Sequence, residues 1–489
     1  MVQLLSESEG IEGLVFVVTG GAGHVGSALC LELARRGAAE VRSFDVCTAL
    51  DRLEVLRAHG ISCITGDVRR KEDVEKAFRN ADCVFHLASF GMSGKEMLQA
   101  RHIDEVNLDG TCNVLDSCIK CGVGRLIYTS TYNVVFGGQE IRNGTEDLPY
   151  FPIESHVDPY GRSKALAEQL VLRSNNRPLK EKRSKKLYTC AIRPAAIYGP
   201  GEDRHFPRIL TMAKYGLFLF RIGSSKVLTD WVFTDNLVHA QLLASMALLD
   251  DIPGRSGLPP AAGQAYFISD GSPINTFEFL RPVVEGLGYS VPQREISVKT
   301  AMRISWFMWG MYILLFPLLQ KSWIPQPFIL PAEVYKVGVT HYCSTWKARQ
   351  ELGYIALVDA KEGMHRTVAY WKELHSRELP SPPLLVWIGI LAGIFLLFLC
   401  AFVPAPFMGP LEFVRSLAFL LFRTQNIMRI GFYTACLAHL VEGGYAWILA
   451  RKVDPSNATG WWLQTSVVGF PSLRLLLQKA RHQRNEKQK

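Results

Sequence analysis

The stretch LVFVVTGGAGHVG, residues 14–26, decides the fold that the sequence predicts. Its first half is a continuous apolar and β-branched run, which is typical of a strand buried on both faces of a parallel sheet. A glycine-rich turn follows, and the residues from His24 to Gly37 have the pattern of a helix. A strand, a glycine-rich turn and a helix in this order predict the beginning of a dinucleotide-binding fold.

Three glycines of this turn, Gly20, Gly23 and Gly26, follow a GxxGxxG spacing, and each has an expected task. The first permits a tight exit from the strand, the second lets the backbone approach a pyrophosphate, and the third lets the helix pack closely. Around His24 and Val25, at the start of the helix, unpaired N–H groups and the helix dipole favour an anion. We therefore expect these five residues to hold the phosphates of a dinucleotide.

An acidic residue at the end of the second predicted strand, VRSFDV, indicates which dinucleotide binds. Asp45 lies nineteen positions beyond Gly26, where a carboxylate accepts hydrogen bonds from ribose hydroxyls and repels a 2′-phosphate. The next two residues, Val46 and Cys47, supply no cation for such a phosphate. This pattern predicts NAD rather than NADP as the cofactor, and we expect Asp67 to approach the adenine edge.

Further apolar runs alternate with helical stretches up to residue 250, among them CVFHLAS, RLIYTST and TCAIRPA. This alternation predicts an α/β fold with a Rossmann, doubly wound parallel sheet. Beyond it, Pro and Gly cluster near residue 253, and a smaller mixed region follows. The expected parts are an NAD-binding catalytic domain (13–250), a substrate-binding and membrane-associated region (251–378), an α-helical transmembrane region (384–478) and a basic tail (479–489).

The strongest membrane signal is LLVWIGILAGIFLLFLCAFV, residues 384–403, which carries no charge and as a helix is about 30 Å long. Residues 304–320 also lack charge but contain Pro317, and we expect a membrane-associated helix or hairpin near the substrate entrance. Residues 430–450 and 459–477 are weaker candidates. Three crossings would leave the basic tail opposite the catalytic domain, against the positive-inside tendency, so the sequence points to two or four.

Charge and composition limit the partners. The formal net charge is +9 and 48% of the residues are hydrophobic, and the basic tail suits a lipid surface. No basic stripe interleaved with aromatic residues occurs in the first 300 residues, so nucleic acid is not expected. The CxxC pair Cys118 and Cys121 has no His or second pair to complete a metal site. The N-terminus has no secretory signal pattern, so we expect the catalytic domain on the cytosolic side.

The sequence Tyr160-Gly-Arg-Ser-Lys164 is the candidate catalytic motif. On a helix, residues four apart share one face, so a phenol and an ammonium would lie side by side. A free tyrosine has a pKa near 10, and a neighbouring positive charge favours the phenolate and lowers that pKa. The motif therefore predicts proton transfer by Tyr160 near neutral pH.

The glycine-rich turn, Asp45 and the Tyr160–Lys164 motif follow one another along the chain as in the extended short-chain dehydrogenase/reductase family, which the sequence resembles. The resemblance is to its 3β-hydroxysteroid dehydrogenase group in particular and, within that group, to the family 42E member 1-like proteins. The resemblance covers residues 13–375 and lies mainly in four stretches. These are HLASFGMSG (86–94), YTSTYNVVFGGQEIRNG (128–144), RPAAIYGPGEDRHFPRI (193–209) and DWVFTDNLVHAQLLA (230–244). The C-terminal apolar region resembles the extra membrane segment of plant members.

The resemblance implies roles for individual residues. Tyr160 would be the general acid/base, and Lys164 would lower its pKa and hold the nicotinamide ribose. Ser130 or Thr131 would hydrogen-bond the reacting oxygen, and the register against related motifs favours Thr131. The implied reaction removes the proton of a substrate hydroxyl while a hydride passes to NAD.

Two further positions and a substrate class follow from the same resemblance. Asn107 looks like the Asn that supports the active-site helix or a proton relay, and Pro194 resembles the position that shapes the nicotinamide pocket. The implied substrate is a steroid or sterol with a 3β-hydroxyl group, and a sterol 4-carboxylate, decarboxylated after oxidation, is equally compatible. The family leads us to expect an endoplasmic reticulum membrane, and the sequence is compatible with an oligomer.

Other readings stay open. Nucleotide-sugar epimerisation uses the same Tyr, Lys and NAD apparatus, another lipid alcohol could replace the sterol, and a non-catalytic membrane scaffold could retain the fold. His439 and Glu442, spaced i and i+3 in an apolar stretch, indicate either a buried polar pair in the membrane or an interfacial segment. Asn457-Ala-Thr459 matches the glycosylation pattern.

Overall fold

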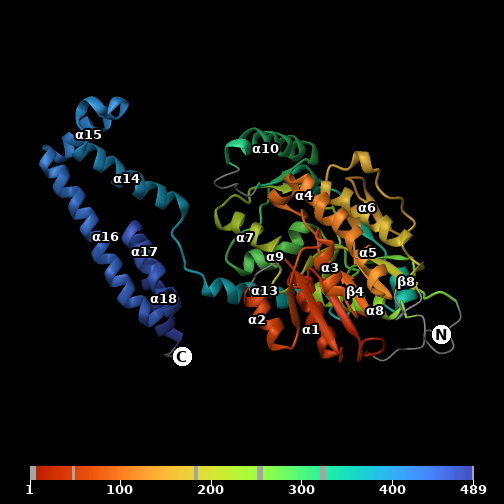
Figure 1. Cartoon of the computed structure of the whole chain (residues 1–489). Helices are drawn as coiled ribbons and strands as arrows, with labels where there is room; N and C mark the ends of the chain where they lie inside the picture. The colour runs from red at the N-terminus through yellow and green to blue at the C-terminus, as the bar shows by residue number, and fades with distance from the viewer. Residues whose placement is uncertain (1–6, 47–49, 181–185, 250–256, 320–326, 487–489) are drawn as a thin grey trace. The chain divides into compact units, whose positions relative to one another are not determined.

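The computed structural model describes residues 7–46, 50–180, 186–249, 257–319 and 327–486. The chain divides into two compact units, unit 1 (Met1–Lys372) and unit 2 (Glu373–Lys489). Unit 1 contains a central sheet with helices on both sides, and unit 2 is helical (Figure 1). Each unit is described by itself below.

The central sheet of unit 1 is parallel along its whole path, in the order β12-β8-β5-β4-β1-β2-β3. Its strands are β1 (Val15–Thr19), β2 (Glu40–Asp45), β3 (Ser62–Thr65), β4 (Cys83–His86), β5 (Arg125–Thr129), β8 (Lys186–Pro194) and β12 (Ala265–Ile268). A short strand, β7 (Arg177–Pro178), pairs antiparallel with β8. The order reverses between β1 and β4, and at such a point the carboxyl ends of the strands leave a crevice for a ligand.

Alternation along β1 shows why the sheet is covered on both faces. Phe16 and Val18 belong to one core cluster, whereas Val17, between them, belongs to another. Successive side chains of a strand point to opposite faces, so a fully apolar strand needs helices on each side. One face is covered by α1 (His24–Arg35), α2 (Leu50–Ala58), α8 (Thr234–Met246) and α12 (Trp346–Leu352). The other is covered by α3 (Lys71–Phe78), α5 (Gly110–Cys121) and α6 (Pro159–Arg173). The predicted fold class is thereby confirmed.

The sheet extends beyond residue 250, because β12 pairs with β8 through the Ala265–Ala191 and Ile268–Pro194 partners. Its four residues, AYFI, are too short to be told from a buried loop by periodicity. The loop near residue 253 lies partly outside the described residues, as does most of the charged stretch 179–186. The remaining part of unit 1 packs around an aromatic cluster that includes Trp231, Phe233 and Trp371.

Further strand pairs and helices complete unit 1. Three two-stranded pairs join β9 (Ala196–Tyr198) to β11 (Trp231–Phe233), β10 (Arg221–Ile222) to β13 (Glu295–Ile296), and β6 (Ile141–Gly144) to β14 (His341–Cys343). The further helices are α4 (Ala100–Asp104), α7 (Phe206–Lys214), α9 (Thr276–Gly286), α10 (Val298–Leu319), α11 (Pro331–Gly338) and α13 (Ala360–Arg377), whose last residues, from Glu373, belong to unit 2. The 304–320 candidate thus forms one helix, α10, up to Leu319 rather than a hairpin, and Trp306, Phe307 and Leu314 on it are exposed.

Unit 2 consists of α14 (Leu384–Phe402), α15 (Glu412–Phe422), α16 (Gln425–Val453), α17 (Ala458–Val468) and α18 (Phe470–Glu486). In the described part of the chain, α14 alone is long and apolar enough to cross a membrane by length and composition. The candidate 430–450 lies within α16. The candidate 459–477 is not one helix, because Gly469 adopts a φ of 73° and separates α17 from α18. Residues 487–489 of the basic tail lie outside the described residues.

Candidate active site

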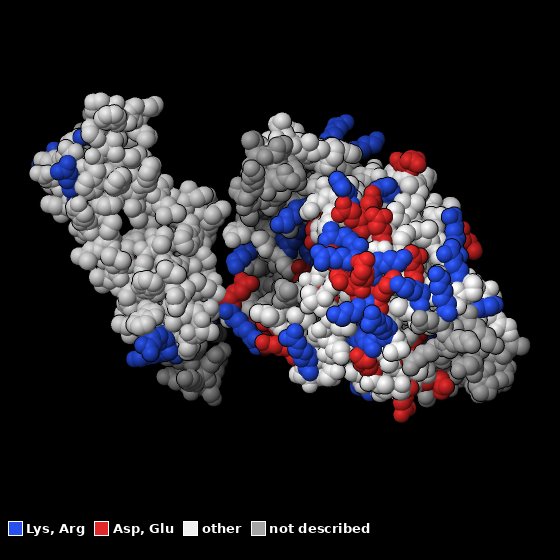
Figure 2. All heavy atoms as spheres, in the orientation of Figure 1, with Lys and Arg blue, Asp and Glu red and all other residues white. Residues whose placement is uncertain are grey.

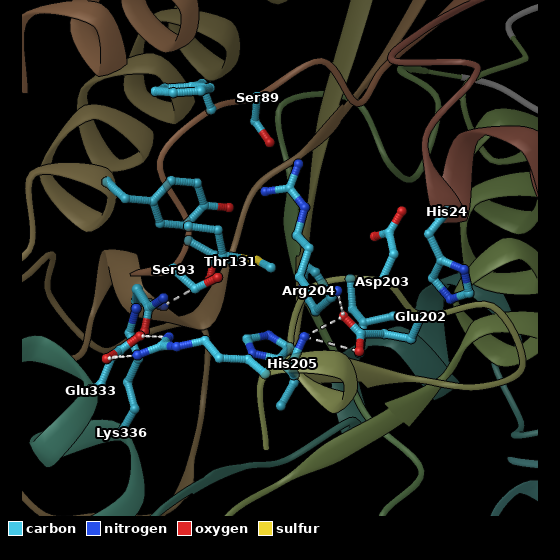
Figure 3. A pocket seen from close by; sticks show the side chains of 18 of the residues that line it. His24, Ser89, Ser93, Thr131, Glu202, Asp203, Arg204, His205, Glu333 and Lys336 are labelled. Carbon is cyan, nitrogen blue, oxygen red and sulfur yellow. Dashed lines mark hydrogen bonds and ion pairs between the residues drawn. The ribbon is translucent and has the colours of Figure 1, made fainter. Parts of the chain in front are cut away.

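The candidate site is a large cavity of unit 1 beside the carboxyl ends of β1 and β4, with a volume of about 810 Å³. This value is near the upper end of the range of roughly 300–1,000 Å³ that is usual for small-molecule sites. The glycine turn after β1, the loop after β4, the start of α6 and the segment after β8 all contribute to its wall. Figure 3 shows Ser89, Thr131 and Arg204 around the same space, with the Arg204 side chain extending toward Ser89.

The glycine turn has the backbone conformation that the spacing predicts. Gly20 has a φ of 71°, and a Cβ there would lie 2.8 Å from the Ala88 backbone nitrogen. A Cβ on Gly26 would lie 2.1 Å from the Gly20 carbonyl oxygen, so this glycine lets the helix meet the turn itself. Gly23 precedes α1 without a side-chain cap, and a Cβ there would contact only the Gly20 carbonyl oxygen within 4 Å. The surface beside Gly23 and the start of α1 is therefore open to a phosphate.

The acidic residues expected at the adenosine end both line the cavity. Asp45 accepts a hydrogen bond from the Ala22 backbone nitrogen at 3.0 Å, which fixes its carboxylate beside the glycine turn. Asp67 forms an ion pair with Arg69 at 2.6 Å. Burial raises the pKa of Asp67, but the hydrogen bonds and charge of Arg69 outweigh this and lower it overall. The carboxylate of Asp67 is thus engaged locally.

One cation near the adenosine end was missed by reading only the residues that follow Asp45. Arg52 of α2 lies on the cavity wall, where it pairs with Asp203 at 2.7 Å and donates to the Gly201 carbonyl at 3.1 Å. Its charge is therefore already balanced by a carboxylate. Of the two neighbours used in the sequence argument, Cys47 lies outside the described residues.

The first turn of α6 carries the candidate catalytic pair. Asp158 caps the helix by accepting from the Tyr160 backbone nitrogen at 2.9 Å, and Pro159 occupies the first turn. The second Asp158 oxygen accepts from Lys336 of α11 at 2.8 Å. Tyr160 and Lys164 are both buried on one side of α6, and Tyr160 lines the cavity. The capped helix end thus holds the phenol in place.

Burial dominates the electrostatics of this pair. It raises the pKa of Tyr160 to about 12, and the groups that oppose it most are the charge of Arg204 and a hydrogen bond with Ser89. Burial also lowers the pKa of Lys164 to about 7, although Glu168 opposes this. The Lys164 ammonium donates to the Thr129 carbonyl at 2.5 Å and lies 4.3 Å from the centre of the Tyr128 ring. The expected lowering of the Tyr160 pKa by Lys164 is therefore not the leading effect here.

Ser130 and Thr131, the two candidate hydroxyls, both line the cavity and are both buried. The Thr131 oxygen accepts from the Asn133 backbone nitrogen at 3.3 Å and so caps a short 3-10 turn. Among the described residues, the Ser130 hydroxyl has no hydrogen-bond partner. A buried hydroxyl without a partner is costly, so Ser130 is at least as well prepared as Thr131 to bond a substrate oxygen.

Asn107 and Pro194 occupy different positions relative to the cavity. Asn107 is buried in a π-helical turn, Glu105–Asp109, and its amide donates to the Ser163 hydroxyl of α6 and to the Phe90 carbonyl, both at 2.9 Å. It thereby connects the loop after β4 to the helix that carries Tyr160. Pro194, at the end of β8, lines the cavity directly.

The rest of the cavity wall is apolar, with a few charges. Its apolar residues come from α7 and the loop after it, from α9 and α10, and from the segment before α11. They include Met212, Leu217, Phe218, Phe220, Phe277, Ile304, Met308 and Phe328. Sequence reasoning missed Arg204, which lies 3.7 Å from Glu96 and is the charge acting on Tyr160. It belongs to the quoted stretch 193–209, but nothing local showed that it meets Tyr160.

The chain is similar to known families in two regions. Residues 17–298 match the 3-beta hydroxysteroid dehydrogenase/isomerase family, and residues 385–478 match Transmembrane protein 254. Short-chain dehydrogenase/reductase family 42E member 1 of Homo sapiens is 44% identical over 396 residues, which cover 80% of this chain and 96% of that protein. The Danio rerio protein of the same name is 47% identical, covering 69% and 84%. A 3beta-hydroxysteroid-dehydrogenase/decarboxylase isoform 1 of Arabidopsis thaliana is 36% identical, covering 75% and 81%.

Solved structures share the fold at lower identity. The epimerase Mth375 of Methanothermobacter thermautotrophicus is 21% identical with a TM-score of 0.55, covering 77% of this chain and 98% of that one. The UDP-glucose 4-epimerase of Thermus thermophilus, solved with NAD, is 23% identical with a TM-score of 0.51, covering 73% and 99%. At these identities the likeness establishes the Rossmann architecture of unit 1.

Proposed function

Because this chain belongs to the 3-beta hydroxysteroid dehydrogenase/isomerase family of oxidoreductases, we propose that it oxidises the 3β-hydroxyl group of a steroid or sterol with NAD. The observation that carries the proposal is the cavity itself. It joins the Tyr160 phenol and the Ser130 and Thr131 hydroxyls to a wall of apolar side chains. A polar reaction centre inside an apolar cavity suits a hydroxyl group on a bulky hydrocarbon.

The residues at the dinucleotide end fit NAD. The open surface beside Gly23 accommodates the pyrophosphate, and the Asp45 carboxylate, held by the Ala22 nitrogen, accepts from ribose hydroxyls and repels a 2′-phosphate. Bound NAD supplies the acceptor for the hydride of the alcohol carbon. Arg52, paired with Asp203, adds no unbalanced positive charge that would favour a 2′-phosphate.

The protein's own residues orient the alcohol and take its proton. In the proposed arrangement the substrate hydroxyl lies between Tyr160 and the hydroxyl of Ser130 or Thr131, and Tyr160 removes the proton. With its pKa raised, the Tyr160 phenol stays protonated at neutral pH and cannot accept a proton, so positive charge nearby has to favour the phenolate. Arg204 supplies that charge from the cavity, and Lys164 supplies it from within α6 when it is protonated.

A sterol carrying a carboxylate next to the hydroxyl is a second candidate substrate. Arg204 favours it, because this guanidinium points into the cavity (Figure 3) and is 3.7 Å from the Glu96 carboxylate, its ion-pair partner among the described residues. Oxidation of the hydroxyl would turn such a substrate into a β-keto acid, which loses carbon dioxide without further redox chemistry. We expect Arg204→Gln to raise the KM for a sterol 4-carboxylate by about tenfold or more. The KM for a neutral 3β-hydroxysteroid, and both values in an Arg101→Gln control outside the cavity, should not change.

Membrane anchoring is part of the proposal. The apolar helix α14 and the similarity of residues 385–478 to Transmembrane protein 254 associate the C-terminal region with a membrane. We place the chain in the endoplasmic reticulum membrane with unit 1 on the cytosolic side, where a sterol in the bilayer reaches the apolar cavity wall. The exposed apolar face of α10, with Phe307 and Leu314, would lie toward the lipid.

The test is NADH formation by the full-length protein in nanodiscs. NAD⁺ or NADP⁺ is supplied with 3β-hydroxysteroids, sterol 4-carboxylates and UDP-sugars, and Tyr160→Phe is measured in parallel. We expect turnover of a sterol with NAD⁺, and a loss of about a thousand-fold in kcat in the Phe variant. Binding of NAD, measured by calorimetry, should be retained in that variant.

Two results would point to another function. Turnover of a UDP-sugar with tightly retained NAD would favour an epimerase. No turnover of any substrate, together with unchanged cellular function of Tyr160→Phe, would favour a membrane scaffold. Turnover of a non-steroidal lipid alcohol would keep the mechanism and change only the substrate class.

A further inference from the structure

We propose that unit 2 crosses the bilayer twice, through α14 and α16, and that α17 and α18 form a re-entrant helical hairpin. The hairpin would return the C-terminus to the side on which α14 begins. The inference rests on the membrane anchoring proposed above but not on the substrate or the cofactor, so an inactive enzyme would leave it standing. In this proposal the hydrocarbon core of a lipid bilayer covers the exposed apolar faces of α14 and α16.

The two proposed crossings run antiparallel. The rings of Phe398 and Phe402, near the end of α14, pack against Phe432, near the start of α16, at 5.7 and 5.4 Å. At the opposite end, Asn457, just after α16, donates to the Arg377 carbonyl, just before α14, at 2.9 Å. The nineteen residues of α14 make a helix about 28 Å long, close to the thickness of a bilayer core. α16 is longer and can cross with some tilt.

Apolar side chains face outward on both helices. On α14 and α16 the exposed large residues include Leu385, Ile388, Phe395, Ile430, Leu437, Leu440 and Ile448. The buried residues of α16 are Met428, near its start, and the small residues Gly443, Ala446 and Ala450 toward its end. Small residues let membrane helices approach closely, and large ones then meet lipid. The face of unit 2 seen in Figure 2 shows Lys and Arg only toward its two ends.

α16 falls short of α14 in hydropathy partly because it carries His439 and Glu442. These two residues face the junction of α17 and α18, since a Cβ on Gly469 would lie 2.8 Å from His439 Nε2 and 2.9 Å from Glu442 Oε2. The mean hydropathy of α16 includes these two residues, although they do not face lipid in the proposed arrangement. The lipid-facing side of α16 is more apolar than that average.

The hairpin geometry comes from the polar contacts between α17 and α18. Near the turn, Thr465 and Gln464 bond the Ser472 hydroxyl at 2.9 and 3.0 Å. Further along α18, Lys479 pairs with Asp454, which lies at the end of α16, at 2.7 Å. α18 therefore returns to the end from which α17 starts, as Figure 1 shows.

The depth of the hairpin is about half a bilayer. The eleven residues of α17 rise about 16 Å, whereas a crossing needs about 30 Å. Arg474 lies on the returning helix, five residues before Lys479. Its side chain is exposed and long enough to reach the interface from there.

His439 satisfies the backbone at the turn. Gly469, with a φ of 73°, ends α17 and leaves carbonyl groups without helical partners. The Nδ1 of His439 donates to one of them, the Val467 carbonyl, at 3.1 Å. Inside hydrocarbon no water can do this, so a helix break requires a protein donor. In this proposal His439 is a positioning residue that holds the turn between α17 and α18.

Charge assigns the two sides. Arg451, Lys452, Lys479 and Arg481 lie at the end that also carries the start of α14 and the basic tail. Arg415, Arg423 and Arg429 lie at the other end, where Arg415 and Arg429 donate to the Val403 and Ala401 carbonyls at the end of α14. The larger positive charge belongs on the cytosolic side, so unit 1 and the C-terminus share it.

Glycosylation of the full chain in endoplasmic reticulum microsomes tests this topology. The natural acceptor at Asn457 should stay unmodified. An acceptor in a long flexible insertion within 403–411 should be glycosylated, and one appended after Lys489 should not. The chain should resist alkaline carbonate extraction. Glycosylation of the C-terminal acceptor would establish a third crossing and overturn the hairpin, and extraction by carbonate would overturn the crossings altogether.

Paired variants test the packing on which the hairpin depends. A Cβ on Gly443 would lie 2.0 Å from the Ser466 hydroxyl, whereas Gly444 has open space. We expect Gly443→Val, but not Gly444→Val, to make residues 458–486 accessible to protease from the cytosolic side. His439→Leu should do the same, and His439→Gln, which keeps a donor, should restore protection. Equal protection of residues 458–486 from protease in all four variants would show that Gly443 and His439 do not hold the hairpin.

Discussion

The two units differ in where their apolar side chains lie: many are buried inside unit 1, whereas many are exposed on the surface of unit 2. In unit 1, Phe16 and Phe85 are fully buried, and charged side chains cover much of the face seen in Figure 2. In unit 2, Leu385 is 81% exposed, while the hydroxyls of Thr465 and Ser472 are buried against each other. The same physical rule accounts for both, because apolar groups leave water and polar groups need partners wherever water is absent.

The difference teaches that exposure has to be judged against the surrounding solvent. A contiguous patch of exposed leucines in water would be a candidate binding surface, whereas in the proposed membrane arrangement the exposed leucines of α14 contact lipid. Both units nevertheless use glycine in the same way, since Gly26 and Gly443 each let two backbone segments meet. The following changes, measured on the full-length protein in detergent micelles, test whether side chains of unit 1 and unit 2 respond differently to substitution.

The largest effect is expected from Gly26→Val. A Cβ there would lie 2.1 Å from the Gly20 carbonyl oxygen, a backbone atom that cannot move aside. We expect loss of folded unit 1 and of NAD binding, seen as loss of its cooperative unfolding transition. Unit 2 should still insert into microsomes. Gly310→Ala, where a Cβ meets open space, is the control, and normal NAD binding by Gly26→Val would contradict the prediction.

A smaller loss is expected when the buried ion pair of unit 1 is broken. Arg193 and Glu168 lie 2.6 Å apart and are almost completely buried. Glu168→Gln would leave a buried guanidinium without its charge partner, and we expect a loss of about 3 kcal/mol in the free energy of unfolding. Glu373→Gln removes the partner of Arg377 from an exposed pair, and here we expect less than about 0.5 kcal/mol. Denaturant titration compares the two, and equal losses would contradict the argument.

Asp230 should make the stability of unit 1 dependent on pH. Burial raises its pKa from 3.8 to about 7, and one of its carboxylate oxygens has no partner among the described residues. Between these values the folded state keeps a proton that the unfolded chain has released, so the free energy of unfolding falls as the pH rises. Asp230→Asn should remove this fall and gain on the order of 2 kcal/mol relative to the parent at pH 8. Thermal unfolding at pH 5 and pH 8 measures it, and identical pH dependence in both proteins would refute it.

The smallest effect is expected from Leu385→Ala in α14. In the proposed membrane arrangement this side chain meets detergent or lipid in the folded state and in the unfolded helix, so its truncation should change the free energy of unfolding by less than about 0.5 kcal/mol. Leu33→Ala, in a fully buried position of unit 1, should cost about 2–5 kcal/mol. If Leu385→Ala were as costly, that residue would be packed against protein in a larger assembly, and the contrast between the units would fail.

The prediction of the fold succeeded where the pattern was local and long. The apolar runs of β1 and β5 and the helix that begins at His24 are recognisable from residues within one turn or strand of each other. β12 was not predicted, because four apolar residues become a sheet strand only by pairing with β8. The stretch 459–477 was taken as one candidate crossing, because hydropathy does not register the conformation of Gly469.

The sequence by itself determined the dinucleotide turn, the acidic residue at the end of β2 and the Tyr160–Lys164 spacing, since each depends on neighbours along one element. Only the tertiary structure brought Arg204 and Ser89 to Tyr160 and joined Asp158 to Lys336. It alone also placed Lys479 against Asp454. These contacts join residues far apart in the chain, and neither composition nor periodicity carries information about which distant segments pack together.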